Sequence, residues 1–429
     1  MSLERDIDNN ISLLNEEVDD ELGVDLDAEE ETGADQPRIR ALNTAIFTVF
    51  IDSIMFSIIL PSLAIYLQDF VDVEDSTYST WLGFISAAHP FGQLVASPLA
   101  GYYFTHRSVT ECMAVFISIF CIGALFYATA GSATGLLISR LIQGIGDANL
   151  TVCRAYVAHV CHSKEKVKYM AYQGAGQGLG FAVGSSLGGL LGLIDTTWYG
   201  LTFNANTSPG YFSFLLGFLN VCFCLKYMKD FSSEQNPASD QNESQILTLA
   251  PNKTGIMLGC LCFFCIISSF SVLLSTTTIY LQTNFSWGTS QIAIIFVGGS
   301  LLGICAFKSI HTLNRKISER WIMTIGFSMG GFAMIAAGGF GGLFNTSLGL
   351  WLSAVCLFFL MHPLAMATNM SIYAKIVGPF KADQGPYMGY ITMMGSFASI
   401  VSPLWATYFL DAEDYSGNFT YVSTGCLLW

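Results

Sequence analysis

Long apolar stretches separated by short polar connections make up most of the chain after residue 41. Crossing about 30 Å of hydrocarbon takes roughly 20 helical residues. Eleven stretches reach that length: 41–66, 79–104, 109–130, 134–159, 169–194, 210–228, 254–280, 290–310, 321–340, 348–374 and 385–410. A twelfth begins near Phe419 and extends about half a span to Trp429. The pattern predicts an all-α polytopic membrane protein of two six-helix repeats, with the twelfth helix truncated.

The polar segments predict four regions: an acidic tail over residues 1–37, repeats over 38–228 and 254–429, and a linker over 229–253. The tail holds 14 of the 32 acidic residues and one of the 18 basic residues, and its lack of apolar periodicity predicts disorder. The remainder is nearly neutral, which does not favour nucleic-acid binding. Leu13 and Leu14, with Asp8 upstream, are similar to a dileucine signal for sorting adaptors, although the acid is one residue too far away. A chance Leu-Leu pair fits equally well.

Basic residues lie in alternate connections, which determines orientation under the positive-inside rule. Lysine or arginine precedes the first span and occupies the 4–5, 6–7, 8–9 and 10–11 connections, and Arg107 lies in the 2–3 connection. The other connections contain neither residue and hold acids such as Asp69 and Asp195. The N-terminus and the linker are therefore expected in the cytosol. Four glycosylation sequons fall in or beside the non-cytosolic connections, at Asn206, Asn284, Asn345 and Asn418.

Three charges interrupt the fourth apolar stretch at seven-residue spacing: Arg140, Asp147 and Arg154. Seven residues return a helix to within about 20° of its starting direction, so the three side chains share one face. Charges at bilayer depth are costly unless they are paired or face water, and they indicate a transport pathway. In that interpretation Asp147 holds either arginine or takes up a proton, and the arginines attract an anion. The alternative is a fixed internal ion pair, with Arg154 reaching the headgroups.

Two further titratable residues are candidates for the pathway. Asp52 lies in the middle of the first stretch, where a proton site and a structural partner of a nearby donor are equally compatible with the pattern. His362-Pro363 in the tenth stretch couples a titratable ring to a kink, and His362 is assigned to the pathway. His89-Pro90 shows the same pattern, but a packing role is favoured there. Neither the cysteines and histidines nor any nucleophile–base pair is spaced as a metal, cofactor or enzyme site would require.

Several motifs resemble those of the major facilitator superfamily. Residues 137–144 (LISRLIQG, with Arg140 and Gly144) are similar to its fourth-span signature, and residues 180–189 (GFAVGSSLGG) to its fifth-span motif. Asp52 with Pro61 resembles the first-span pattern. In the loop between the second and third spans Gly101 is present, but Thr105 and His106 replace the usual charged residues, so this motif does not predict the cytosolic charge latch that is usual in the superfamily. Glycines in these motifs are expected to form a hinge or a tight packing seam, above all Gly144, Gly180, Gly184 and Gly188.

Within the superfamily, several stretches are similar to the lysosomal family of major facilitator domain-containing protein eight. They are residues 91–98, 152–156, 177–181, 372–379 and 387–389. The resemblance implies a lysosomal or endosomal multi-pass membrane protein that moves a small solute or an anion such as chloride. Three functions remain open: a carrier that works by alternating access and is coupled to protons or another ion, a chloride-conducting channel on the same fold, and a non-transporting receptor or scaffold.

Overall fold

The computed structural model describes residues 36–72, 77–161, 165–191, 194–198, 201–231, 253–287, 289–338, 347–378, 381–412 and 418–428. The chain consists of two compact units, which meet after Arg40 in the sequence. The arrangement of helices described below is that of the second unit, residues 41–429. Apart from one short hairpin, the elements of the described ranges are helices, so the predicted all-α fold is confirmed. Residues 1–35 of the expected tail, including Leu13 and Leu14, and residues 232–252 of the expected linker lie outside the described residues, and α2 already begins at Gln36.

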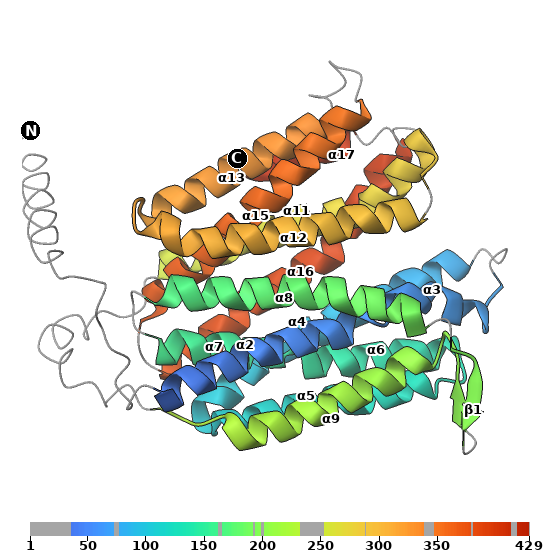
Figure 1. Cartoon of the computed structure of the whole chain (residues 1–429), viewed down its shortest axis with the longest axis horizontal. Coiled ribbons are helices and arrows are strands. Elements are labelled where there is room, and N and C mark those ends of the chain that lie inside the picture. Colours follow the sequence, from blue (N-terminus) through green and yellow to red (C-terminus); the bar gives the residue numbers. More distant parts are fainter. Residues whose placement is uncertain are drawn as a thin grey trace, which may run out of the picture. The chain divides into compact units, whose positions relative to one another are not determined.

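The first half of the chain forms eight helical segments in the described part (Figure 1). They are α2 (Gln36–Ser57), α3 (Leu60–Gln68), α4 (Tyr78–His106), α5 (Val109–Ala128), α6 (Ala133–Asp147), α7 (Asn149–Val160), α8 (Lys166–Leu191) and α9 (Ser208–Tyr227). Two expected spans are each divided into two segments. The stretch 41–66 is interrupted just before Pro61, whose ring removes a backbone donor. The stretch 134–159 is interrupted at Ala148.

A two-stranded hairpin precedes α9 and was not predicted from the apolar pattern. Strand β1 (Thr196–Trp198) pairs antiparallel with β2 (Leu201–Phe203), with Thr196 opposite Phe203. Beyond the hairpin, the Asn206 side chain donates a hydrogen bond to Asp69 Oδ2 at 2.5 Å. This contact ties the connection before α9 to the end of α3.

The second half of the chain forms six helices within the described ranges. They are α11 (Lys253–Phe285), α12 (Thr289–Asn314), α13 (Glu319–Ala337), α15 (Leu348–Val377), α16 (Lys381–Ala412) and the 11-residue α17 (Asn418–Leu428). Across both halves, six described segments are long and apolar enough to cross a membrane by length and composition alone. The glycine-rich α8 is not among these six segments, because its polar and small residues lower its mean hydropathy.

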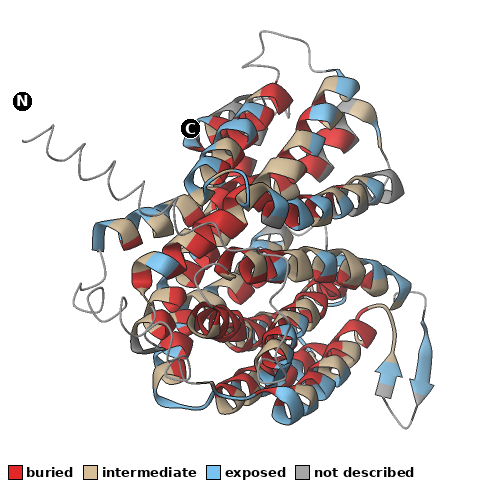
Figure 2. Ribbon diagram, turned by 60° about the vertical axis from the view of Figure 1, so that its left-hand side comes forward, coloured by how far each residue is buried: buried red, intermediate tan, exposed pale blue. Residues whose placement is uncertain are grey.

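The two halves meet along α4 and α16, and along α8 where it packs on α12 and α15 (Figure 1). We call the end of the bundle that carries Arg107, Lys226 and Lys316 the basic end, and the opposite end, with Asp69 and Asp195, the acid end. Figure 2 shows the buried residues on helix faces turned toward neighbouring helices. The halves are thus joined by helix pairs and not by a shared sheet.

The hydrophobic core is continuous between the halves toward the basic end and divided at the acid end. One cluster combines Phe104 and Tyr156 of the first half with Tyr373 and Met388 of the second. At the acid end each half has its own cluster. The one in the first half contains Tyr66 and Tyr127, and the one in the second contains Tyr280, Trp351 and Tyr421. Within the described residues, the halves therefore close on each other at the basic end and form separate cores at the acid end.

The tightest crossing of the two halves is between α4 and α16. A Cβ added at Gly101 would collide with the backbone of Gly385, and one added at Gly389 would lie 2.7 Å from the Ser97 carbonyl oxygen. Only residues without side chains allow two helix backbones to approach so closely. These glycines seal the basic end at the place where the motif lacks its usual charges.

Candidate transport site

The three charges of the fourth span lie near the middle of the bundle, but they do not form one straight stripe. Arg140 and Asp147 belong to α6, which starts at the Ser132 cap, and Arg154 belongs to α7, beyond the interruption at Ala148. Both arginines are buried, whereas 14% of the Asp147 side chain is exposed. Among the described ion pairs, neither arginine is paired with Asp147. The direct ion pair between Asp147 and an arginine that the sequence interpretations included is thus not among the described contacts, and each of the three groups has other neighbours.

Arg140 is held by neighbours on its own side of the bundle. Its Nη1 donates to Gln143 Oε1 at 2.8 Å, and Gln143 in turn donates to the Gly123 carbonyl oxygen at 3.3 Å. The guanidinium lies 5.3 Å from the centre of the Phe56 ring, a cation–π contact. Its Nε is buried and has no hydrogen-bond partner in the described part of the chain. Arg140 is therefore a desolvated cation with donor capacity left over.

Asp147 is bound by α4, a connection that spacing along one helix could not show. Gln93 Nε2 donates to Asp147 Oδ2 at 2.8 Å, and His89 Nε2 lies 3.8 Å from the same oxygen. The other end of the Gln93 amide crosses to the second half, where Oε1 accepts a hydrogen bond from Ser396 Oγ at 2.7 Å. Gln93 and Ser396 were missed by sequence reasoning. A polar amide within an apolar span was the available signal.

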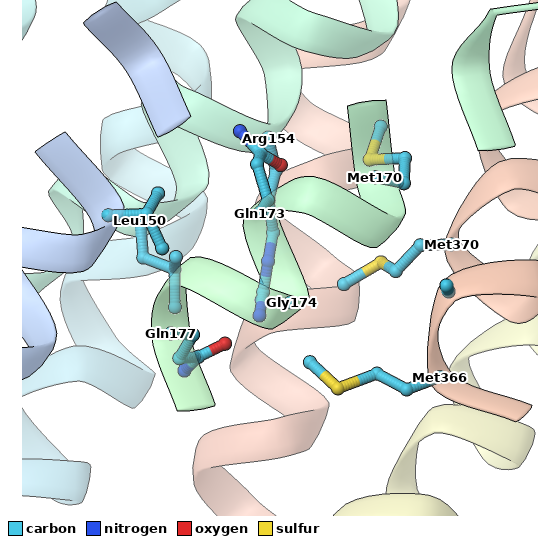
Figure 3. Close-up of a pocket in the computed structure, with 10 residues that line it drawn as sticks. Leu150, Arg154, Met170, Gln173, Gly174, Gln177, Met366 and Met370 are labelled. Atoms are coloured by element: carbon cyan, nitrogen blue, oxygen red, sulfur yellow. The ribbon is translucent and has the colours of Figure 1, made fainter. Parts of the chain in front are cut away.

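Arg154 lies at the junction of the two halves. Its Nη1 donates to Thr392 Oγ1 on α16 at 3.1 Å, and its guanidinium lies 5.4 Å from the centre of the Phe263 ring on α11. It also lines a small pocket together with glutamines and methionines of α8 and α15 (Figure 3). The labelled residues from these two helices are Met170, Gln173, Gly174, Gln177, Met366 and Met370. Arg154 thus contacts the second half, and the structure gives it partners within the protein.

Asp52 is enclosed by two amide donors. Asn149 Nδ2 donates to its Oδ2 at 2.7 Å, and Asn220 Nδ2 to its Oδ1 at 3.3 Å. Thr48 extends the network, with its Oγ1 donating to Asn220 Oδ1 at 3.4 Å. The arrangement joins α2, α7 and α9 within the first half. These neighbours favour the structural interpretation of Asp52 over that of a proton site.

His362 lies in the second half within an aromatic cluster. Its ring stacks on Phe270 at 5.1 Å and tilts against Phe358 at 5.3 Å, and its Nε2 lies 3.3 Å from the Ile266 carbonyl oxygen. The described contacts link this histidine to apolar neighbours and a backbone group. They do not bring it together with Arg140 or Asp147.

The motif glycines form packing seams in the first half. A Cβ at Gly144 would collide with the backbone of His89, which presses α6 against α4. On α8, a Cβ at Gly180, Gly184 or Gly188 would meet the α2 backbone or its serine side chains and, at Gly188, the connection between α2 and α3. Close helix approach is the role that this geometry gives them.

The structure describes the side chain of one of the four candidate glycosylation asparagines. Asn206 is buried and bonded to Asp69. Asn345 lies outside the described residues, and Asn284 and Asn418 are placed as helix residues without a description of their side chains.

Comparison with known proteins agrees with this fold. A sequence profile described as Major Facilitator Superfamily matches residues 45–403. The chain is 25% identical over 439 residues to major facilitator superfamily domain-containing protein 8 of Xenopus laevis, covering 84% of this chain and 83% of that protein. This match confirms the resemblance inferred from the motifs.

Two solved structures have a similar arrangement of helices. The human organic anion transporter MFSD10 (TETRAN) matches with a TM-score of 0.73 and 18% identity, over 92% of this chain and 100% of that one. The proton:xylose symporter XylE, bound to 6-bromo-6-deoxy-D-glucose, matches with a TM-score of 0.71 and 13% identity, over 91% and 93%. At such identities the likeness shows the fold alone. With the profile covering most of its length, the chain belongs to the major facilitator superfamily and is a multi-pass membrane transporter protein.

Proposed function

We propose that this chain is a carrier that moves a small anion across a lysosomal or endosomal membrane by alternating access. Two buried arginines carry the proposal. Arg140 lies within the first half and has an unpartnered Nε among the described residues, and Arg154 lines a pocket where the two halves meet. Desolvated guanidinium groups favour binding of carboxylates and other anions. The organic anion transporter among the structural relatives agrees with this substrate class.

The arrangement of the halves supports a carrier. A carrier alternates between states closed at one end and then at the other, through movement of one repeat against the other. The continuous core at the basic end and the separate cores at the acid end correspond to one such state. In this proposal the basic end faces the cytosol, as the positive-inside rule predicts. The acid end faces the lumen.

Transport by the purified full chain in proteoliposomes tests the proposal. Radiolabelled chloride and a radiolabelled monocarboxylate serve as probes, each with and without excess unlabelled anion on the opposite side. A carrier accelerates exchange when unlabelled anion is present on the opposite side, whereas a channel conducts without it. We expect counterflow with at least one probe, and its loss in Arg140→Ala. Large voltage-linear chloride currents would instead establish the channel, and the absence of any flux would favour the receptor or scaffold.

A further inference from the structure

His89 and Asp147 form a pair that the sequence pattern did not indicate. His89 Nε2 lies 3.8 Å from Asp147 Oδ2, and this nitrogen is buried with no hydrogen-bond partner in the described ranges. An unpartnered buried polar nitrogen is unusual and needs an explanation. A proton shared between the two side chains, after a small approach of the ring, would give each of them a partner.

The surroundings keep the pair in place while leaving one side accessible. The His89 ring packs on Phe56 at 4.5 Å and on Phe120 at 6.5 Å, and the backbone of Gly144 fits against the His89 carbonyl. Asp147 is the more exposed partner. The carboxylate is therefore the group through which a proton from the solution would arrive.

The other charged groups around the pair are balanced. Asp52 on α2 and the two arginines Arg140 and Arg154 on α6 and α7 lie within electrostatic range of Asp147. From α16, the described neighbours of this region are the hydroxyl groups of Thr392 and Ser396. With His89 neutral, two carboxylates and two guanidinium groups cancel, so one added proton gives the cluster a net positive charge.

We propose that His89 and Asp147 together bind a proton, and that Gln93 transmits its binding to the contact between the two halves. Gln93 donates to the Asp147 carboxylate and accepts from Ser396, so one amide connects the pair to α16. Hydrogen bonds to an ionised acceptor are roughly twice as strong as neutral ones. Protonation weakens the Gln93–Asp147 bond, loosens the Gln93–Ser396 bridge and favours separation of the halves at the basic end. The inference deepens the proposed carrier by naming its coupling ion.

Distance measurements on the full chain in lipid nanodiscs test this without a transported solute. Spin labels are attached at Lys226→Cys and Lys316→Cys, one exposed basic-end residue in each half. The exposed native cysteines are first replaced by serine: Cys222, Cys305, Cys356 and Cys426. Lowering the pH from about 7.5 to about 5, the range of histidine titration, is expected to increase the population at the longer distance. His89→Asn and Asp147→Asn are each expected to lose this response.

Two further variants separate proton binding from simple disruption. Gln93→Leu removes the bridge but keeps the pair, so we expect the longer distance at both pH values. His362→Asn is the matched control, because His362 is also followed by proline in a helix but already has a backbone partner. A wild-type distance that does not change with pH would overturn the inference, as would a full response in well-folded His89→Asn. Loss of the response in His362→Asn would also overturn it. A pH response without anion flux would support proton binding by His89 and Asp147 and contradict the proposal that the protein is an anion carrier.

Discussion

The buried Asp52 carboxylate is stabilised by individual hydrogen bonds from two amide side chains. Its strongest described bond is the 2.7 Å contact from Asn149. Asn149→Leu leaves Oδ2 buried without that donor, which typically costs about 1–3 kcal/mol. Loss of Asn149 Oδ1, itself unpartnered in the described part, offsets some of this cost. We expect an apparent melting temperature several degrees lower in detergent.

A double-mutant cycle distinguishes this local effect from general damage. In an Asp52→Leu background the carboxylate is absent, so Asn149→Leu should destabilise the protein less than it does in the wild type. Equal costs in both backgrounds would show that the Asn149–Asp52 contact contributes little to stability.

Asn206 provides a residue-scale prediction about glycosylation. A glycan is attached at the side-chain nitrogen, which here is buried and donates to Asp69. We expect Asn206→Gln to leave the number of glycans unchanged, and Asn345→Gln to remove one if the acid end is lumenal. Mobility shifts after glycosidase treatment measure both. A glycan lost from Asn206→Gln would mean that glycosylation precedes formation of the Asp69 contact.

At the scale of helices, the crossing of α4 and α16 depends on glycine. Gly101→Leu places a side chain against the backbone of Gly385 and forces the helices apart. We expect the basic end to lose its seal, so that a cysteine at buried Ala100 becomes more reactive toward a polar thiol reagent by several-fold. Gly83→Leu is the matched control on the same helix, because a Cβ there meets no atom within 4 Å. Equal labelling in the two variants would argue against a seal at Gly101.

The positions of the helices along the chain could be predicted from the sequence, whereas the contacts between helices could not. Apolar runs of sufficient length place the spans, because a span is a local property of about 20 residues. The interruption at Ala148 has no proline or polar run to signal it. The contact of Asp147 with Gln93 depends on which face α4 turns toward α6, and that is determined by packing over the whole bundle. Seven-residue spacing predicts a single helix face for the three charges, whereas the structure divides them between α6 and α7 and shows no direct pair of Asp147 with either arginine among the described ion pairs.

For the whole molecule, two-fold repetition explains why sequence reasoning succeeded for the fold but was incomplete for the site. The fold was predicted from the number of apolar spans and from motifs such as that around Arg140, and the superfamily profile matches residues 45–403. The seam between halves joins residues far apart in the chain, as with Gln93 and Ser396, which are 303 positions apart. No local pattern encodes such a pair. The contacts proposed here to carry function are therefore the ones that a single sequence predicts least well.

The glycine crossing at the basic end has a consequence for how the protein responds to its medium. The crossing of α4 and α16 at this end is made by glycine backbone and apolar side chains, and Arg154 donates across it to the neutral hydroxyl group of Thr392. Salt shortens the Debye length to about 3 Å at 1 M and weakens exposed ion pairs, but it leaves dispersion contacts intact. We expect the distance between labels at Lys226→Cys and Lys316→Cys to be the same in dilute buffer and in molar salt. A large salt-dependent change would reveal an electrostatic latch; without one, the seal is independent of the ionic composition of the compartment.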